Sequence, residues 1–295
     1  MRVAVLLFAA ALSGCQSQSV PCEVPSPPVP DSLQRDVNAL TTPEMAGRKT
    51  GSEGARLAAD YLVERFSTLG MTPWHGSIRH PFQYGPGWLA KSGENLVVWV
   101  PGPPPYRLVM AHYDHLGRKQ GQFHPGADDN ASGVAVLLAL AEQAQQHPPA
   151  QGVIFAALDA EENGLYGSKA LVQQLTGVEL EWVLNLDMVG RPPKDGRAQL
   201  WWRHGWQGGE QALNTLQPHL CTEAGRRRMK GQDGIHYDSL HASDHYPFHQ
   251  ASVNWLYLGV PPHRDYHSPN DRAERLDYPF MSRVLAASWA LLNRP

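Results

Sequence analysis

Apolar positions along the chain follow two alternating periods, and this alternation predicts where helices and strands lie. Apolar residues recur at helical spacing in five segments, which are 53–70, 132–146, 165–175, 207–220 and 279–292. Short β-rich apolar runs predict strands at 95–100, 107–112, 153–158, 182–186, 199–202 and 252–258. Strands that alternate with helices predict an α/β fold, in which a central mixed and mostly parallel sheet carries helices on both faces.

The first fifteen residues resemble a bacterial export signal. Met1 and Arg2 form a short positive start, and residues 3–12 form an apolar run that is too short to span a bilayer as a helix. The run ends in LSGC, which resembles the lipobox of bacterial lipoproteins, where the cysteine, here Cys15, is lipidated and becomes the new N-terminus. The alternative is an ordinary signal peptide with an incidental cysteine. Because no aspartate follows Cys15, we expect a lipid-anchored protein of the cell envelope, at the outer membrane and facing the periplasm.

Residues 16–33 contain many Pro and Ser residues and almost no apolar periodicity, which predicts a tether. No internal repeat or second linker follows, so we expect a single domain at 34–295 after a signal peptide at 1–15. The other cysteines are Cys22 and Cys221, and their spacing leaves open whether they form a disulfide. Without CxxC spacing, the cysteines argue against a thiolate zinc site.

Charge excludes one class of function. The 295 residues carry a formal net charge of −3, which is not the charge of a nucleic-acid-binding surface. One basic cluster, Arg226-Arg227-Arg228 with Lys230, lies between glycines, and we interpret it as a solvated loop.

Polar residues follow four of the predicted strands at the point where each strand ends. These residues are His112 and Asp114, then Asp159, Glu161 and Glu162, then Asp187, and finally His267. In open α/β sheets, ligands bind outside the carboxyl ends of the strands, so we expect these side chains to converge. Imidazoles and carboxylates together suit zinc or a similar divalent metal.

The stretch PGADDNASG, at 125–133, opens the helix that follows the first of these strands. Taken alone, it is typical of a turn with a helix cap. However, two metals held ~3.5–4 Å apart need a bridging ligand, and a carboxylate has two oxygens to provide it. Asp128 and Asp129 are the candidates.

Six motifs in the same order resemble the co-catalytic dizinc aminopeptidase family, whose relatives include glutamate carboxypeptidase II, the zinc-dependent glutaminyl cyclases and the transferrin-receptor ectodomain. The motifs are AHYDHLG, PGADDNASG, LDAEENGLYGS, NLDMVG, SDHYPF and YHSPND, and the likeness runs from about Leu40 to the end. The resemblance implies a zinc-exopeptidase, phosphorylase/hydrolase-like fold for the domain at 34–295.

The resemblance also implies a ligand set. The family's bridging aspartate stands three residues before the serine of the SG pair, which here is Asp129, and the peptide bond after it is commonly cis. The implied metal ligands are His112 and Asp187 for one zinc, Glu162 and His267 for the other, and Asp129 for both. Asp128 stays unassigned.

Three further residues gain roles by the same resemblance. Glu161 is implied as the general base, which takes a proton from the attacking water and passes it to the leaving amine. Asp114 is implied to hydrogen-bond the far nitrogen of His112. Tyr266 matches a tyrosine that stabilises the tetrahedral oxyanion. Asp244 matches a position near the active site and has no assigned role.

Other chemistry-bearing residues have plainer interpretations. We expect His241, His245 and His249 to form a polar helix face rather than a metal site. We expect the tryptophans Trp201, Trp202 and Trp206 to pack in the core. Asp128, His115 and His263 are not expected to be ligands.

The sequence therefore predicts a monomeric metallo-aminopeptidase with two Zn²⁺ per chain, which hydrolyses peptides that have a free N-terminus. A single-zinc glutaminyl cyclase and a dizinc carboxypeptidase remain alternatives, because the bridging and base positions do not separate them. A non-catalytic binding protein is a weaker alternative, since every ligand and the base are present.

Overall fold

Four parallel strands form the centre of the sheet in the computed structural model, which describes residues 23–232 and 234–294. The whole sheet contains nine strands in the order β1-β3-β7-β4-β8-β13-β9-β10, with β2 paired to β3. The central strands are β7 (Val153–Leu158), β4 (Tyr106–His112), β8 (Leu180–Asp187) and β13 (Trp255–Gly259). They pair in parallel, so their carboxyl ends meet at one edge.

Antiparallel strands extend the sheet on both sides, which makes it mixed as expected. On one side β3 (Lys91–Val100) pairs with β7, and it also pairs with β2 (Arg79–Tyr84) and β1 (Thr72–Pro73). On the other side β9 (Ala198–Trp202) runs antiparallel to β13 and parallel to β10 (Thr222–Ala224). Two small hairpins, β5–β6 (Arg118–Lys119 and Gln122–Phe123) and β11–β12 (Arg228–Lys230 and His236–Asp238), lie outside the sheet.

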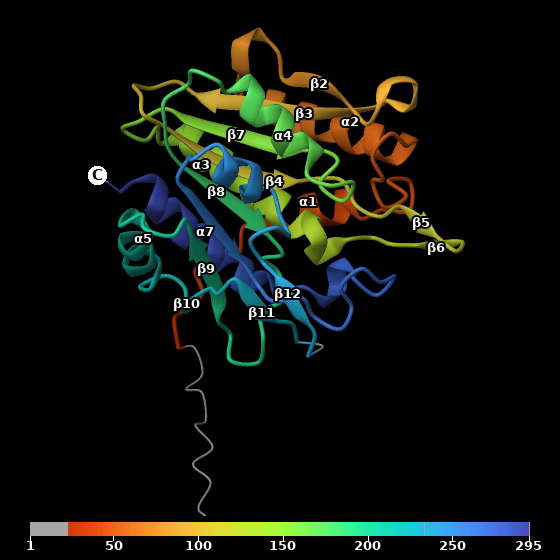
Figure 1. Cartoon of the computed structure of the whole chain (residues 1–295). Coiled ribbons are helices and arrows are strands. Elements are labelled where there is room, and N and C mark those ends of the chain that lie inside the picture. The colour runs from red at the N-terminus through yellow and green to blue at the C-terminus, as the bar shows by residue number, and fades with distance from the viewer. Residues whose placement is uncertain (1–22, 233, 295) are drawn as a thin grey trace, which may run out of the picture.

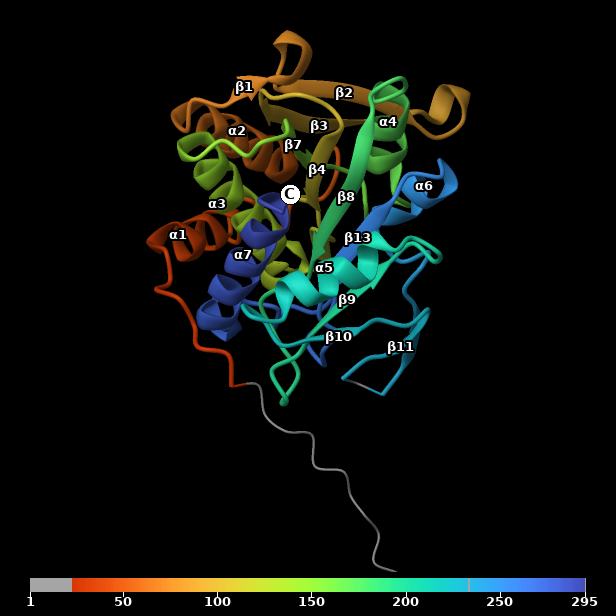
Figure 2. The same cartoon turned by 90° about the vertical axis from the view of Figure 1, so that its left-hand side faces the viewer.

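Helices cover both faces of the sheet. Figure 2 shows α1, α2, α3 and α7 grouped on one side, and α4 and α6 on the other. Their bounds are α1 Asp31–Leu40, α2 Glu53–Thr68, α3 Gly133–Gln146, α4 Tyr166–Gln174, α6 His245–Gln250 and α7 Tyr278–Leu292. The remaining helix, α5 (Gly208–Leu216), packs on α7 at the edge of the first face.

Alternation along the strands explains why two layers form. On β4, Val109 and Ala111 belong to the hydrophobic cluster under α3, while Leu108 and Met110 belong to the cluster under α4. Successive side chains of a strand point to opposite faces, so a strand that is apolar at every position needs a layer on each side. The continuous apolar runs of the sequence therefore predicted this architecture correctly.

The N-terminal boundary differs in one respect from the expectation. Helix α1 begins at Asp31, inside the range 16–33 that was expected to be a tether. The helix buries Leu33, Val37 and Leu40 completely. Because this apolar face is short and directly follows a proline-rich stretch, the periodicity of the sequence does not show where the helix begins. Ahead of it, the Ser282 hydroxyl of α7 donates to the carbonyls of Pro27 and Pro28.

The cysteines and the export signal lie mostly outside the described residues. Cys221 is disulfide-bonded, and the other two cysteines of the chain are Cys15 and Cys22. Both fall outside the described range, as does the whole of the expected signal peptide. Within that range, no helix combines the length and apolarity needed to cross a bilayer.

Candidate metal centre

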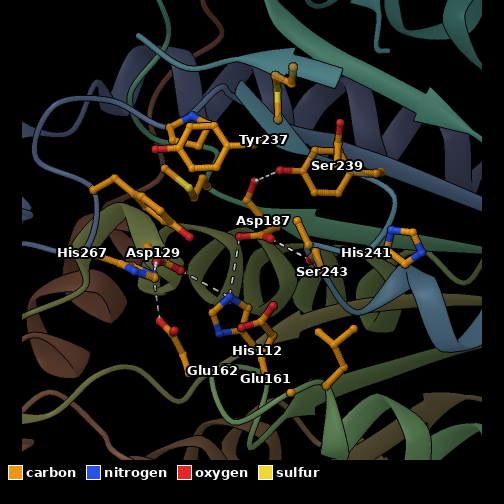
Figure 3. Close-up of a pocket in the computed structure, with 18 residues that line it drawn as sticks. His112, Asp129, Glu161, Glu162, Asp187, Tyr237, Ser239, His241, Ser243 and His267 are labelled. Atoms are coloured by element: carbon orange, nitrogen blue, oxygen red, sulfur yellow. Dashed lines mark hydrogen bonds and ion pairs between the residues drawn. The ribbon is translucent and has the colours of Figure 1, made fainter. Parts of the chain in front are cut away.

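The carboxyl edge of the central strands brings the expected site residues together (Figure 1). His112 is the last residue of β4 and Asp187 is the last residue of β8. Glu161 and Glu162 follow β7, and His267 lies in the segment after β13. Figure 3 shows these side chains pointing into one cavity.

Asp129 lies between two groups of donors and turns one carboxylate oxygen to each (Figure 3). Its Oδ1 is 3.4 Å from His112 Nε2, and its Oδ2 is 3.1 Å from His267 Nε2. On the first side, His112 Nε2 is also 3.6 Å from Asp187 Oδ1. On the second side, His267 Nε2 is 3.3 Å from Glu162 Oε1. A carboxylate in this position can bridge two ions, as expected for Asp129.

The segment that carries Asp129, residues Ala127–Ser132, is held by side chains from distant parts of the chain. The Asp271 carboxylate accepts the backbone N–H groups of Asp128 and Asp129, at 2.9–3.0 Å. The Asn130 side chain donates to the carbonyl of Leu186 at the end of β8. The Asp129–Asn130 peptide bond is cis, as the family resemblance implies.

Asp128 serves this segment rather than the metal. Its Oδ1 accepts the Gly190 N–H at 2.6 Å and the Ser132 hydroxyl at 3.1 Å. Its Oδ2 lies 3.2 Å from His263 Nε2. Asp128 therefore connects the start of α3 to the segments after β8 and β13. Of the two candidate bridging aspartates, Asp129 is the one that faces the other donor groups.

Arg48 binds the backbone next to the same segment. It is completely buried, and its guanidinium donates to the carbonyls of Tyr113, Pro125 and Gly126, as well as to that of Leu40. These bonds join the segment after β4 to the segment before Asp129. Burial lowers the pKa of Arg48 to about 10, so the side chain stays charged at neutral pH.

Asp114 has a broader role than expected. His112 Nδ1 lies 3.2 Å from the Asp114 backbone carbonyl and 3.7 Å from its carboxylate, so the carbonyl is the nearer partner. The carboxylate instead accepts the backbone N–H groups of Glu161 and Glu162, at 3.0 and 3.3 Å. Asp114 thereby fixes both the ring of His112 and the segment that carries the two glutamates.

Sequence reasoning missed Ser243, which orients Asp187. Its hydroxyl donates to Asp187 Oδ2 at 2.6 Å and accepts from the Asn185 amide at 2.7 Å. The available signal was the motif SDHYPF, which contains Ser243 and Asp244. Asp244 is also completely buried.

The charges of the site shift several pKa values. Burial raises the pKa of Glu161 well above its usual range; His112 opposes this shift, and the negative charge of Asp244 adds to it. Burial also raises the pKa of Asp244 to about 7. Desolvation alone would lower the pKa of His267, but its contacts with Asp129 and Glu162 raise it to about 10.

The cavity above these residues has a volume of about 320 Å³. Its walls beyond the donor groups include Leu165, Met188, Met229 and Tyr237, where Met229 and Tyr237 come from the paired strands β11 and β12. Tyr266 also lines it, and its ring stacks on His267 with a centroid distance of 3.8 Å. Tyr266 therefore lies at the cavity, and its role toward an oxyanion stays a prediction.

One expectation outside the ligand set needs correction. His245 is completely buried and packs on Trp255, which contradicts the expected polar helix face, while His241 precedes α6 and contacts Asp238. His115, which was not expected to be a metal ligand, has its Nδ1 3.0 Å from Glu162 Oε1.

Other expectations are confirmed. Trp201 packs against Trp255, and Trp202 and Trp206 pack against the larger hydrophobic cluster. These three tryptophans also line a second cavity, of about 500 Å³, beside α5. The basic cluster at 226–230 has exposed arginines and an exposed lysine, as expected, but Arg228–Lys230 forms strand β11 and not the expected loop.

Two relatives found by sequence comparison have the names of peptidases. The aminopeptidase YwaD of Bacillus subtilis (strain 168) is 34% identical over 188 residues, which cover 59% of this chain and 37% of that protein. A probable zinc metalloprotease of Pyricularia oryzae (strain 70-15) is 28% identical over 251 residues, which cover 68% of this chain and 50% of that protein. The chain thus spans half or less of the length of these curated relatives.

Solved structures share the fold. The glutaminyl cyclase of Fimbriiglobus ruber superposes with a TM-score of 0.71 at 18% identity, and the match covers 91% of this chain and 97% of that one. This likeness confirms the α/β architecture, with its mixed sheet between two helical layers. The model of peptidase family M28 matches residues 95–292, which contain every expected ligand and the expected base. The chain therefore belongs to peptidase family M28.

Proposed function

We propose that the protein is a zinc-dependent aminopeptidase, which binds two zinc ions and removes N-terminal residues from peptides. The observation that carries this proposal is the position of Asp129, whose two carboxylate oxygens face two separate His–carboxylate pairs. Membership of a peptidase family and the names of the relatives, an aminopeptidase and a probable zinc metalloprotease, support it.

The donor groups fit zinc. Zinc–ligand bonds of ~2.0–2.2 Å place neighbouring ligands of a tetrahedron about 3.3–3.6 Å apart. The donor atoms on the two sides of Asp129 are 3.1–3.6 Å apart. In addition, Glu162 Oε1 is buried without a hydrogen-bond partner among the described residues, as expected for an atom that a cation satisfies. Two bound zinc ions supply Lewis acidity toward the scissile carbonyl and toward the attacking water.

Glu161 is the proposed general base. It lines the cavity beside His112 and Asp187, and its backbone is fixed by Asp114. It takes a proton from the attacking water and delivers that proton to the leaving amine. The Tyr266 hydroxyl is the proposed donor to the oxyanion of the tetrahedral intermediate.

The charge of the cavity favours an N-terminal substrate over a C-terminal one. Four carboxylates line it, and none of its lining residues within the described part of the chain is Lys or Arg. Three of these carboxylates are proposed zinc ligands, so two bound ions would offset their charge. What argues against a C-terminal substrate is that the described lining offers no guanidinium or ammonium group to pair with its carboxylate. Met188, Met229 and Leu165 give the remaining wall an apolar surface.

We also propose that the protein acts in the cell envelope, held at the outer membrane by a lipid on Cys15. The LSGC motif and the serine and glutamine after it support this location. An anchored enzyme at this position would act on peptides of the periplasm.

The test uses the full chain in detergent, first stripped of metal and then supplied with zinc. Matched peptides with free and acetylated N-termini are incubated with both forms and followed by mass spectrometry. Zinc-dependent loss of single N-terminal residues, from the free peptide alone, is the expected result. Loss of ammonia from an N-terminal Gln without cleavage would instead identify a glutaminyl cyclase, and cleavage at the C-terminus would identify a carboxypeptidase.

A further inference from the structure

His115 is a buried histidine whose ring nitrogens both lack a hydrogen bond among the described residues. It lies three residues after the end of β4, and 1% of its surface is exposed. Buried imidazole nitrogens are nearly always paired, and the groups near His115 Nδ1 are carboxylate oxygens that form no well-directed hydrogen bond with it.

The backbone holds this ring in place. The His115 N–H donates to the carbonyl of Arg48, at 3.2 Å. On the other side, a Cβ atom at Gly126 would lie 2.5 Å from His115 Cδ2, so only glycine leaves room for the ring there. The imidazole therefore occupies a site that the fold keeps open beside the PGADDNASG segment.

Two carboxylate oxygens lie in front of His115 Nδ1. Glu162 Oε1 is 3.0 Å away and Asp129 Oδ2 is 3.7 Å away. The same two oxygens are 3.3 and 3.1 Å from His267 Nε2. Two imidazoles thus approach one pair of carboxylate oxygens from different directions, with an angle of 65° between the rings.

A simple hydrogen bond does not account for this contact. Glu162 Oε1 and His115 Nδ1 are close enough for one, yet their orientation leaves both atoms unpaired. Ligands of a common ion have this relation, because each lone pair points to the ion rather than to the neighbouring ligand. The four separations average close to the ~3.3 Å that a tetrahedral zinc site requires.

We propose that His115 is an additional ligand of the metal position formed by Asp129, Glu162 and His267. The inference rests on the proposed zinc-dependent function. It makes the two positions unequal: the one beside His115 has two imidazoles and four protein donors, while the one beside His112 keeps a more open coordination sphere. Closed four-ligand sites retain zinc, and open ones leave a position for water or substrate. The position beside His115 therefore binds zinc more tightly and loses it last on chelation.

The test measures metal binding to the metal-free full chain in detergent, with Zn²⁺ alone in competition with a chromophoric chelator. His115→Gln retains an amide that can hydrogen-bond Glu162 but is a poor zinc ligand. Loss of a residue that only hydrogen-bonds a metal ligand weakens metal affinity by ~10–100-fold. Because His115 would be a ligand itself, we expect the zinc affinity of one of the two binding steps to fall by at least about 100-fold. His115→Ala should behave in the same way. His124→Gln is the matched control, since His124 is also buried, faces the Gln122 carbonyl and should keep both affinities.

A second variant gives a direct spectroscopic readout. His115→Cys places a thiolate where the imidazole was, so Co²⁺ alone should bind and produce a sulfur-to-cobalt charge-transfer band that the wild type lacks. Absence of this band, or wild-type affinities in His115→Gln, would overturn the inference. If the wild type binds two zinc ions and cleaves peptides in that case, the proposed function survives. If the wild type binds no zinc, both fail together.

Discussion

At the scale of single residues, the proposed base and the proposed metal ligand that follows it point their side chains to different parts of the site. Glu161 and Glu162 are neighbours in the chain, and Asp114 accepts the backbone N–H of each. Glu162 turns toward Asp129 and His267, whereas Glu161 lies beside His112 and Asp187. Since both glutamates are fixed through the backbone, their side chains can take different roles without disturbing each other.

Replacement of Glu161 by Gln should leave zinc bound and remove the general base. We expect kcat to fall by about 10²–10⁴-fold, because an amide cannot accept the proton of the attacking water. Glu162→Gln is the matched variant, and it should lose zinc from one position. Zinc per chain by elemental analysis, together with kcat on a dipeptide, distinguishes the two. Loss of zinc from Glu161→Gln would contradict the assignment of this residue as base.

Zinc affinity should rise with pH. Contacts with Asp129 and Glu162 raise the pKa of His267 to about 10, so its ring is protonated in the metal-free protein at pH 7. Zinc binds only the deprotonated ring and must displace that proton, so affinity increases with pH until the proton is lost near the raised pKa. Chelator competition between pH 6 and pH 9 measures the slope, and a dye assay in weak buffer measures proton release. A flat profile would show that His267 is neutral before zinc binds.

At the scale of elements, the site depends on how the segments after the strands are tied together. Arg48 joins the segment after β4 to the segment before Asp129 through backbone carbonyls. Asp271 joins that same segment to the region that carries His267. The strands deliver the ligands to one edge, but these contacts between segments set the distances between them.

Loss of Arg48 should destabilise the protein strongly. Arg48→Met removes the donor of four buried carbonyl groups. The Gly126 carbonyl keeps the Ala131 N–H, so three are left unsatisfied, at a cost of ~1–3 kcal/mol each. We therefore expect the free energy of unfolding of the metal-free protein, measured in urea, to fall by at least about 3 kcal/mol. Arg56→Met is the control, because Arg56 is exposed and solvent screens its pairs with Glu53 and Asp60, so its loss should change stability little. Equal effects of the two substitutions would refute the role of Arg48.

At the scale of the whole molecule, the N-terminal segment is bound to the domain at more than one place. Ser282 and Arg283 of α7 hold residues 24–28 by hydrogen bonds. Cys221, near the far edge of the sheet, is disulfide-bonded, and both other cysteines of the chain precede residue 23 in the sequence. A lipid on Cys15 would therefore act on a segment that is closely attached to the domain.

If Cys15 carries a lipid through its sulfur, Cys22 must be the partner of Cys221. Peptide mapping without reduction should then recover Cys22 linked to Cys221, and the N-terminal peptide should carry the mass of the lipid. Because the bond closes a very long loop, its reduction should lower the free energy of unfolding by ~2–5 kcal/mol. Recovery of Cys15 linked to Cys221 would rule out lipidation of Cys15.

Local patterning was enough for most of the fold. The expected strand at 153–158 coincides with β7, and the expected helix at 132–146 differs from α3 by one residue. The elements that were not expected are short or bear few apolar residues, as in α1 and the β11–β12 hairpin. Such segments take their structure from the surfaces that they contact, so their own periodicity carries little information.

The sequence by itself determined which residues reach the catalytic edge, because a strand's last residue and the direction of a parallel sheet are both local properties. His112, Asp187 and the glutamates after β7 follow from this rule. Only the tertiary structure decided what holds them: Asp271 binds Asp128 across 143 positions of the chain, and Ser243 binds Asp187 across 56. Partners at such separations are chosen by the packing of segments after the sheet has formed. For the same reason, only the folded chain brings His115 to the metal position.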